Sequence, residues 1–426
     1  MSRTLTTTRS DCPVCGADVP AAIVERDGAA VFRKECPEHG ARETPFSPDA
    51  GLFERVQSLT SPGVMPEGPL DLDQGDADGF LTTFAIDVTT RCNLDCPTCV
   101  SAAGRDADRD IPVADLLSWI PDYSRRPGRR RPNISLVGGE SALREDLPEI
   151  VRGVIGKGLV PRLNSNGLLL QDERRLARLW DAGLRWVILQ FDGLEPASSI
   201  AFRGRDFSRQ KLDVIRVLSA KGFAIHLAVM VEMGVNDHEV GAILRLAARE
   251  PGVRRVSFYP RSRIGRFEGP GDSATHVADV LAAMEKGTGG EVTVRDVLDA
   301  KRVGRTLFRL TGHPMFRQRN CIFPLVLLRR GERLLPASRL FRPGGLLRDP
   351  AAAWRLAREA ANLLRPDDRR FASDFLFVNV EKFYDRDAFD SVAARNCHHV
   401  YLTAKGAFPF CVYNAFLRET RESSIE

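Results

Sequence analysis

Cysteines 92, 96 and 99 form the group of residues with the most specific chemistry in this chain. They stand in the segment Cys92-Asn93-Leu94-Asp95-Cys96-Pro97-Thr98-Cys99, and no fourth cysteine or histidine is near them in the sequence. Three thiolates suit a cubane [4Fe–4S] cluster with one open iron, whereas a structural zinc site is closed by a fourth ligand. We therefore interpret the group as a cluster whose open iron can bind a small bidentate molecule. The alternatives are a zinc knuckle or buried thiols.

The segments after this motif alternate between strands and helices. We expect strands at Phe84–Val88, Ile134–Val137, Pro161–Asn164, Trp186–Phe191, Ala224–Val231 and Arg255–Tyr259. Between them, apolar residues recur at three- and four-residue spacing, which predicts helices at Asp146–Ile155, Glu173–Ala182, Ser208–Ala220 and Glu239–Ala248. Six such units predict a parallel sheet or partial barrel with its active site at the carboxyl ends of the strands.

Polar and glycine-rich segments follow these strands in order. The second strand leads into Gly138-Gly139-Glu140, the third into Asn164-Ser165-Asn166-Gly167, and the fourth ends in Gln190-Phe191-Asp192-Gly193. Tyr259 ends the sixth strand. Each segment alone is a weak signal, but together they place carboxylates, amides and flexible backbone on the same rim as the cysteines.

This combination resembles the radical S-adenosylmethionine (SAM) superfamily. The resemblance implies that the SAM amine and carboxylate bind the open iron and that the GGE-like segment, Gly138, Gly139 and Glu140, receives the SAM amine. It also implies that Gln190 and Asp192 bind the ribose, and that Asn164, Asn166 and Tyr259 complete the pocket, with Tyr259 near the adenine. A reduced cluster would then split SAM into methionine and a 5′-deoxyadenosyl radical, which takes hydrogen from an unactivated carbon. Thr98 stands where many relatives carry an aromatic residue.

A second metal set lies near the amino terminus. Cys12 and Cys15 have CxxC spacing, and Cys36 and His39 have CxxH spacing, with a predicted hairpin between the two pairs. Four such ligands predict a closed tetrahedral site for Zn²⁺ or a rubredoxin-like iron, and metal binding would stabilise a domain with almost no core. A structural role is favoured; electron relay through a mononuclear iron is the alternative.

The third set is Cys321, Cys397 and Cys411. The segment from Asn396 to Asn414 resembles a subgroup that contains tetraether lipid synthases and class D radical SAM methyltransferases, and the N-terminal pairs match the same subgroup. The resemblance implies one auxiliary [4Fe–4S] cluster, with His398, His399, His313 or an outside ligand on its fourth iron. The alternative is three separate buried cysteines.

Composition sets the remaining expectations. There are 61 Lys and Arg against 56 Asp and Glu, a net charge of +5 that by itself does not imply nucleic acid. The nine cysteines cannot all pair with one another, and with no secretory leader or apolar span of ~20 residues we expect a cytoplasmic protein with metal-bound cysteines. We predict an α/β protein with a metal knuckle at 1–58, a linker at 59–80, a partial (β/α)6 radical SAM barrel at 81–265 and an α+β auxiliary-cluster region at 266–426.

The functional prediction is a radical SAM enzyme acting at an unactivated sp³ carbon of a small molecule. It would form a C–C bond on a lipid-like or other substrate; Leu325–Leu328 and Leu346-Leu347 amid arginines would suit an alkyl tail with an anionic head. Methyl transfer is the alternative, with carbon from a folate or a second SAM, and a non-catalytic electron-transfer or metal-binding protein is the third. The resemblance also implies an electron donor such as ferredoxin or flavodoxin.

Overall fold

The computed structural model describes residues 2–61, 83–104, 110–125, 131–267, 275–312, 316–331, 333–363, 374–384, 386–395 and 397–418. Most of the predicted linker, and His313, lie outside these ranges.

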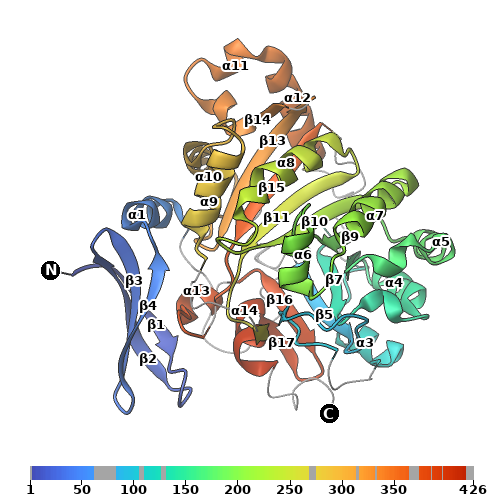
Figure 1. The fold of residues 1–426 in the computed structure, drawn as a ribbon, viewed down its shortest axis with the longest axis horizontal. Coiled ribbons are helices and arrows are strands. Elements are labelled where there is room, and N and C mark those ends of the chain that lie inside the picture. The colour runs from blue at the N-terminus through green and yellow to red at the C-terminus, as the bar shows by residue number, and fades with distance from the viewer. Residues whose placement is uncertain are drawn as a thin grey trace.

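The amino-terminal residues form a small four-stranded antiparallel sheet in the order β1-β2-β3-β4 (Figure 1). Its strands are β1 (Arg3–Asp11), β2 (Asp18–Arg26), β3 (Ala29–Cys36) and β4 (Gly40–Ser47), and helix α1 (Ala50–Leu59) follows. The predicted hairpin is β2–β3, and its two turn residues, Asp27 and Gly28, both have positive φ, as a tight hairpin turn of the Asp-Gly type requires. β1 and β4 add a strand at each edge.

All six predicted barrel strands are present and run parallel. They are β5 (Thr83–Thr89), β7 (Asn133–Gly138), β8 (Val160–Ser165), β9 (Trp186–Gln190), β10 (Ala224–Val231) and β11 (Val253–Pro260). Each pairs in parallel with the next, so their carboxyl ends meet at one rim. The predicted helices also form, as α4 (Leu147–Gly156), α5 (Glu173–Asp181), α7 (Ser208–Lys221) and α8 (Val240–Arg249), together with α3 (Val113–Trp119) and α6 (Pro196–Arg203).

The strands of the carboxyl-terminal region do not make a sheet of their own. β15 (Phe375–Glu381) pairs in parallel with β11, and β16 (His399–Thr403) pairs in parallel with β5, so this region extends the barrel sheet at both edges. Antiparallel partners complete it: β13 (Ile322–Arg330), β14 (Arg333–Pro336) and β17 (Gly406–Pro409). The described residues thus form an 11-stranded sheet in the order β14-β13-β15-β11-β10-β9-β8-β7-β5-β16-β17.

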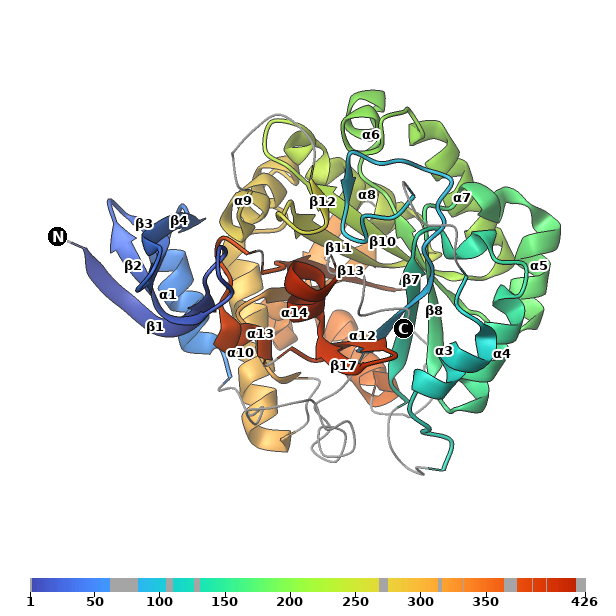
Figure 2. The same cartoon turned by 90° about the horizontal axis from the view of Figure 1, so that it is seen from below.

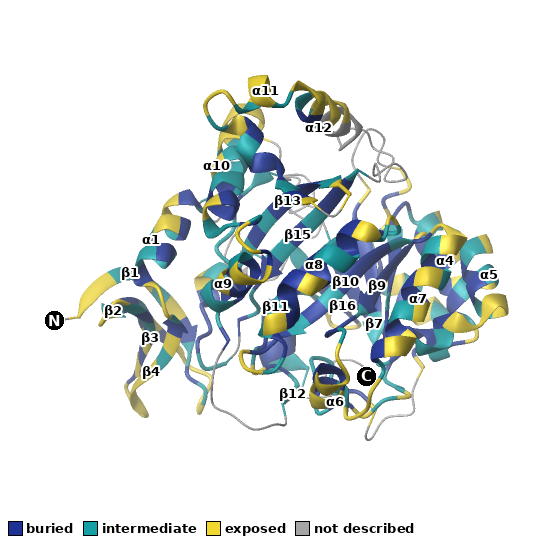
Figure 3. Cartoon of the chain, turned by 45° about the horizontal axis from the view of Figure 1, so that its top comes forward, coloured by how far each residue is buried: buried dark blue, intermediate teal, exposed yellow. Residues whose placement is uncertain are grey.

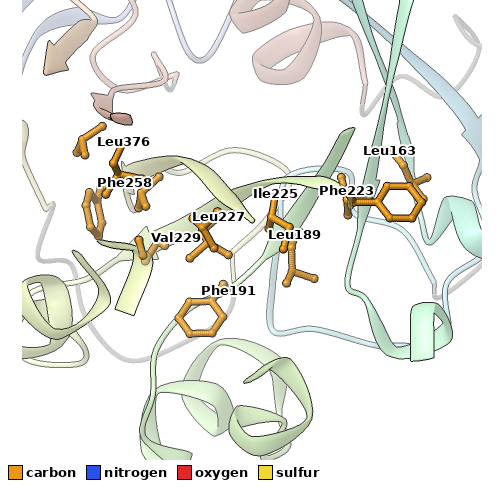
Figure 4. Packing of buried hydrophobic residues seen from close by; sticks show 14 of the residues in the cluster. Leu163, Leu189, Phe191, Phe223, Ile225, Leu227, Val229, Phe258 and Leu376 are labelled. Carbon is orange, nitrogen blue, oxygen red and sulfur yellow. The ribbon is translucent and has the colours of Figure 1, made fainter. Parts of the chain in front are cut away.

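Side chains along each barrel strand point alternately to the side of the sheet that faces the helices and to the side that faces the cavity. On β10, Ile225, Leu227, Val229 and Val231 are fully buried and belong to the main hydrophobic core. Figure 4 shows part of this core, with side chains of neighbouring strands side by side, and Figure 3 shows that the strands are mostly buried while the outer helix faces are exposed. The alternate positions of each strand, such as His226 and Ala228, face the inside of the barrel and line the cavity there.

The remaining helices belong to the carboxyl-terminal half. They are α9 (Val277–Gly287), α10 (Val294–Thr311), α11 (Gly345–Arg348), α12 (Pro350–Leu363), α13 (Ser391–Arg395) and α14 (Phe410–Val412), and β6 (Thr98–Cys99) and β12 (Arg266–Phe267) form a short separate pair. Asp349 precedes α12, and its side chain accepts a hydrogen bond from the Ala352 N–H at 3.0 Å.

The N-terminal sheet packs against the carboxyl-terminal segments. Thr8 donates to Asp390 at 2.6 Å, and Lys34 Nζ donates to the carbonyl of Arg386 at 2.8 Å. Phe32 and Phe46 share a hydrophobic cluster with Cys411 and residues near it. Seen from below, α14 and β17 lie between the N-terminal sheet and the parallel strands (Figure 2).

Candidate active site and metal centres

The loop that carries Cys92, Cys96 and Cys99 leaves the carboxyl end of β5 and is held by the loop that follows β7. Gly139 N donates to the Thr89 carbonyl at 2.9 Å, and Glu140 N donates to the Arg91 carbonyl at 2.8 Å. A Cβ on Gly138 would stand 2.1 Å from the Thr89 oxygen, and one on Gly139 would stand 1.9 Å from the Arg91 oxygen. A side chain at either glycine would therefore collide with the backbone of the cysteine loop. The close backbone contact that the two glycines allow fixes the position of that loop.

Sulfur spacing distinguishes this cysteine set from the amino-terminal one. In a tetrahedral zinc site with Zn–S bonds of 2.3 Å, sulfurs are about 3.8 Å apart. Cys12, Cys15, Cys36 and His39 place their ligand atoms within 4.8 Å of one another; among the described residues, the Cys92, Cys96 and Cys99 sulfurs do not meet that limit. Cys92, Cys96 and Cys99 thus lack the compact spacing that the amino-terminal ligands have.

The thiols of Cys92, Cys96 and Cys99 are partly or fully buried and line a cavity inside the barrel. Burial raises the pKa of Cys92 to about 11, and burial also raises the pKa of Cys96. Burial therefore disfavours free thiolates at these two positions, and the charge of a bound metal would favour them.

Glu140 joins the β7 and β8 rims. Its carboxylate is buried and accepts from the Ser165 hydroxyl at 2.7 Å, the Asn166 N–H at 2.7 Å and the Ala142 N–H at 3.0 Å. Burial raises the pKa of Glu140, while these hydrogen bonds act in the opposite direction. Asn166 in turn donates to the Asn93 side chain at 2.7 Å, which ties this rim to the cysteine loop.

Asp192, predicted at the ribose, is engaged by an arginine that the sequence analysis did not single out. Arg203 Nε and Nη2 lie 2.6 and 2.7 Å from the two carboxylate oxygens, and both side chains are buried. Arg203 also donates to the Thr98 carbonyl at 3.1 Å and hydrogen-bonds the Cys96 side chain. Gln190 lines the cavity, but Asp192 does not. Asp192 therefore acts on the cysteine loop through Arg203.

Lys211 of α7 is a second buried cation that the sequence did not indicate. Its Nζ donates to the Gln190 side chain at 2.8 Å and to the Gln190 carbonyl at 3.0 Å, and also reaches the Asn166 carbonyl. Burial lowers the pKa of Lys211 to about 8. It cross-links the β8 and β9 rims, where the predicted SAM contacts Asn166 and Gln190 lie.

Arg266 holds the cysteine loop from the side of β12, and Arg261 packs on the neighbouring Phe267. Arg266 Nε donates to the Cys96 carbonyl at 2.7 Å, and its Nη2 donates to the Ala103 carbonyl at 2.9 Å. Arg261 pairs with buried Glu232 and stacks its guanidinium 3.8 Å from the Phe267 ring centre. Phe267 is the strand partner of Thr98. An aromatic residue of a neighbouring strand therefore lies beside position 98, where many relatives have an aromatic residue in the cysteine motif itself.

The described residues enclose a cavity of about 490 Å³ below the rim, within the usual range for small-molecule sites. Its wall reaches from the cysteine loop to the carboxyl-terminal segments. Tyr259 lines it and stacks on Phe383, with ring centres 5.1 Å apart and an interplanar angle of 13°. The Asn164 side-chain oxygen is buried there without a hydrogen-bond partner among the described residues, so it is available to a ligand.

The third cysteine set lies next to residues that line this cavity. The Cys411 thiol hydrogen-bonds Cys397. Cys321 is close enough for its charge to raise the pKa of Cys411, and Cys397 is close enough to raise the pKa of Cys321. The three sulfurs do not fall within 4.8 Å of one another, so this set also lacks the compact spacing of the amino-terminal ligands. Their neighbours Ile322, His398 and Phe410 line the cavity.

The amino-terminal site has the geometry of a closed mononuclear centre. His39 Nδ1 lies 3.7 Å from the Cys12 sulfur and 3.5 Å from the Cys36 sulfur, and the Cys15 and Cys36 sulfurs are 3.9 Å apart. Hydrogen bonds from the N–H groups of Cys15 and Val14 lower the pKa of Cys12 to about 6. The knuckle thus stabilises a thiolate before metal arrives, as a metal-binding turn should.

Comparison with known proteins agrees with this geometry. The family described as the radical SAM superfamily matches residues 86–247, and the HMPTM N-terminal zinc ribbon domain matches residues 4–47. The chain contains a radical SAM domain behind an N-terminal zinc ribbon. The cofactors of the superfamily are a [4Fe–4S] cluster and SAM, and the N-terminal zinc ribbon holds Zn²⁺ or another metal.

Individual relatives cover less of the chain. A 7,8-dihydro-6-hydroxymethylpterin dimethyltransferase of Methanocaldococcus jannaschii is 32% identical over 68% of this chain and 60% of its own length, and a GTP 3′,8-cyclase of Acaryochloris marina is 35% identical over 41% and 56%. This chain thus spans about three-fifths of these curated relatives. The structure of Streptococcus suis SuiB bound to S-adenosylmethionine is 12% identical, with a TM-score of 0.41 over 61% of this chain and 66% of that one.

Within the ranges that the structure describes, no helix is both long and apolar enough to cross a bilayer.

Proposed function

We propose that this radical SAM enzyme transfers a methyl group to a carbon atom of a small polar ring compound. The observation that carries the proposal is the cavity itself, which is lined by Cys92, Cys96 and Cys99 and also by neighbours of the third cysteine set, Ile322, His398 and Phe410. The dimethyltransferase relative, named for a pterin, supports methyl transfer and a ring substrate of this kind.

The polar wall of the cavity supports a polar substrate over a lipid-like one. Ser257 donates to Glu381 at 3.0 Å and Asn379 donates to the same oxygen at 2.9 Å, so a carboxylate is held at the inner face. The leucines that suggested an alkyl chain do not line the cavity: Leu325 and Leu328 are buried in the protein core, and Leu347 is 88% exposed.

We assign roles to this chain's residues as follows. Cys92, Cys96 and Cys99 hold the SAM cluster. Gly138, Gly139, Glu140, Asn164, Asn166, Gln190 and Tyr259 form the SAM pocket, and Asp192 positions Arg203 against the cysteine loop. Cys321, Cys397 and Cys411 hold a second [4Fe–4S] cluster, and Cys12, Cys15, Cys36 and His39 hold a structural zinc ion. An electron donor such as ferredoxin or flavodoxin supplies the electrons.

When bound, the cluster and SAM supply a carbon radical that removes hydrogen from the substrate. The overall reaction uses two SAM molecules and two electrons from the donor. One SAM leaves as methionine and 5′-deoxyadenosine, which carries the substrate hydrogen; the other leaves as S-adenosylhomocysteine after giving its methyl group. The protein's part is to hold the substrate carbon inside the cavity and to keep water away from it.

The experiment is an anaerobic incubation of the reconstituted full chain with SAM, dithionite and 7,8-dihydro-6-hydroxymethylpterin, with products read by mass spectrometry. We expect 5′-deoxyadenosine, S-adenosylhomocysteine and a methylated pterin that carries deuterium when the SAM methyl group is deuterated. Absence of 5′-deoxyadenosine from a preparation with full iron content refutes the radical reaction. 5′-Deoxyadenosine without S-adenosylhomocysteine refutes SAM as the methyl donor.

A further inference from the structure

Glu381 ends β15 on the inner face of the sheet, where it lines the cavity and is 7% exposed. Its Oε1 accepts from the Ser257 hydroxyl at 3.0 Å and from the Asn379 side-chain amide at 2.9 Å. Both hydrogen bonds that the described residues give to this side chain end on that one oxygen. A carboxylate has two acceptor oxygens, and a largely buried acceptor is costly to leave without a donor. Oε2 of Glu381 is therefore an acceptor that the fold holds in place and leaves for a ligand.

His226 adds a second acceptor to the same wall. The Ser257 hydroxyl has one hydrogen and donates it to Glu381, so its 2.8 Å contact with His226 Nε2 requires the ring hydrogen on Nε2. Nδ1 then carries a lone pair; it is buried and has no hydrogen-bond partner among the described residues. Burial, together with the charges of Arg255 and Arg162, lowers the pKa of His226 well below its ordinary value, so the ring is neutral.

The strand register places the two acceptors along one diagonal of the inner face. His226 of β10 stands opposite Arg255 of β11, and Ser257 follows two residues later on the same face. Ser257 stands opposite Asn379 of β15, and Glu381 again follows two residues later. Each step leads toward the carboxyl ends of the strands, so His226 lies deeper in the barrel than Glu381 and both face one cavity.

Two acceptors on one wall select a ligand with hydrogen-bond donors on the side that faces them. Amino groups and ring N–H groups of a flat heterocycle are such donors. A carbonyl oxygen in the same place would set its lone pairs against those of the wall and leave the buried acceptor unpaired. An anionic group would also be repelled by the Glu381 carboxylate.

We propose that Glu381 and His226 recognise the donor groups of the substrate ring. Glu381 Oε2 accepts from an exocyclic amino group, and His226 Nδ1 accepts from a ring N–H. The substrate class is a nitrogen heterocycle that carries both kinds of donor. This inference rests on the proposed function above, which makes the occupant of the cavity the substrate.

The test compares two rings that differ at one position. 7,8-Dihydro-6-hydroxymethylpterin carries an amino group where 7,8-dihydro-6-hydroxymethyllumazine carries an oxo group, and both have ring N–H groups. Each is titrated calorimetrically, without oxygen, into the reconstituted full chain with SAM present and no reductant, so that no turnover occurs. We expect wild type to bind the pterin about ten- to a hundredfold more tightly, because the oxo group of the lumazine leaves Glu381 Oε2 without a donor.

Glu381→Gln should invert this preference. Ser257 and Asn379 donate to the position of Oε1, so the amide oxygen takes that place and the amide NH₂ takes the place of Oε2. The variant then presents a donor to the ring and should bind the lumazine more tightly than the pterin, an inversion that unfolding does not produce. Glu291→Gln is the matched control, a half-buried carboxylate 3.0 Å from Arg245 outside the cavity, and it should keep the wild-type ratio.

His226→Phe separates the second acceptor from the first. Phenylalanine keeps a flat ring and removes Nδ1, which both probes meet with a ring N–H. The variant should therefore weaken both rings by a similar factor of about ten and leave their ratio unchanged. Loss of the pterin preference in His226→Phe, with the preference retained in Glu381→Gln, overturns the assignment of the amino group to Glu381.

Three further results overturn the inference. They are no binding of either ring, wild-type affinity for the pterin no more than twofold above that for the lumazine, or a ratio that Glu381→Gln leaves within twofold of wild type. Methylation of the pterin is measured with dithionite on the same preparations. A methylated product without a preference for the pterin refutes the role of Glu381 alone. A preference that inverts in Glu381→Gln, without any methylated product, refutes methyl transfer alone.

Discussion

Replacing Asp192 by Asn tests whether the buried ion pair with Arg203 positions the cysteine loop. The change removes the charge that pairs with a guanidinium 2.6 Å away and leaves that guanidinium buried, since the Arg203 side chain is only 9% exposed. Breaking a buried pair from one side costs about 3–5 kcal/mol. Because Arg203 also contacts Thr98 and Cys96, we expect its displacement to loosen the cluster ligands as well.

The matched control is Asp213→Asn, which breaks an Asp–Arg pair of similar length, 2.7 Å to Arg216, on the exposed face of α7. That pair is 57% and 68% exposed, so its loss should cost at most about 1 kcal/mol. The free energy of unfolding is measured by urea titration of each variant before cluster reconstitution. Iron and sulfide per chain after reconstitution, with the EPR signal of the reduced cluster, report on the cysteine loop.

The double variant Asp192→Asn with Arg203→Met decides the cause. Removing both charges eliminates the unpaired cation, so we expect it to recover most of the stability that the single variant loses. The reasoning is refuted if Asp192→Asn unfolds within 1 kcal/mol of Asp213→Asn, or if the double variant is no more stable than the single one. Normal iron content in a destabilised Asp192→Asn chain would restrict the ion pair to a stability role.

Three other predictions follow from the site geometry. Gly139→Ala should destabilise the chain by about 1–3 kcal/mol and lower its iron content, because the new Cβ meets the Arg91 oxygen at 1.9 Å. Gly156→Ala is the control, since there is open space around Gly156, and it should change neither the unfolding free energy nor the iron content in the same urea and iron assays. Lys211 has a folded pKa of about 8 against an ordinary 10.5, so the folded chain binds fewer protons between these values and stability from this group rises with pH across pH 8–10.5. In urea titrations at several pH values, Lys211→Met should lose this rise of the unfolding free energy with pH. Lys221→Met, at the exposed end of the same helix, should keep it. A wild-type profile that is no steeper than that of Lys211→Met would contradict the lowered pKa of Lys211. Cys411→Ala should lower iron from about eight atoms beyond the N-terminal site to about four while 5′-deoxyadenosine formation persists in part; unchanged iron would refute the second cluster.

The sequence predicted the barrel well because its signals are local. β10 was predicted with its observed ends, Ala224–Val231, since a buried parallel strand is nearly continuous in apolar residues. The four predicted helices depend on spacing within about one turn and were also confirmed. The amino-terminal ligands were found because CxxC and CxxH spacings dictate their own turn geometry, and the structure places all four together.

What the sequence did not predict depends on contacts between distant residues. Nothing local in β15 or β16 indicates that they extend the barrel sheet at opposite edges, because strand neighbours are chosen by tertiary packing. Arg203 and Lys211 lie in ordinary amphipathic helix sequence, and only the fold brings them under the cysteine loop and the rim. An arginine pointing inward on a strand is a signal that could have been followed, as at Arg162 and Arg255, both of which fall on the inner alternate positions.

The sequence by itself therefore determined which atoms can hold metal and which rim they occupy, since cysteine spacing and strand ends are properties of short segments. Tertiary structure decided what those groups face. It directed the Asp192 carboxylate to Arg203, and it brought neighbours of the third cysteine set into the wall of the cavity that the first set lines. The physical reason is that charge pairing and cavity shape arise from side chains tens of residues apart, whose distances exist only after the sheet has formed.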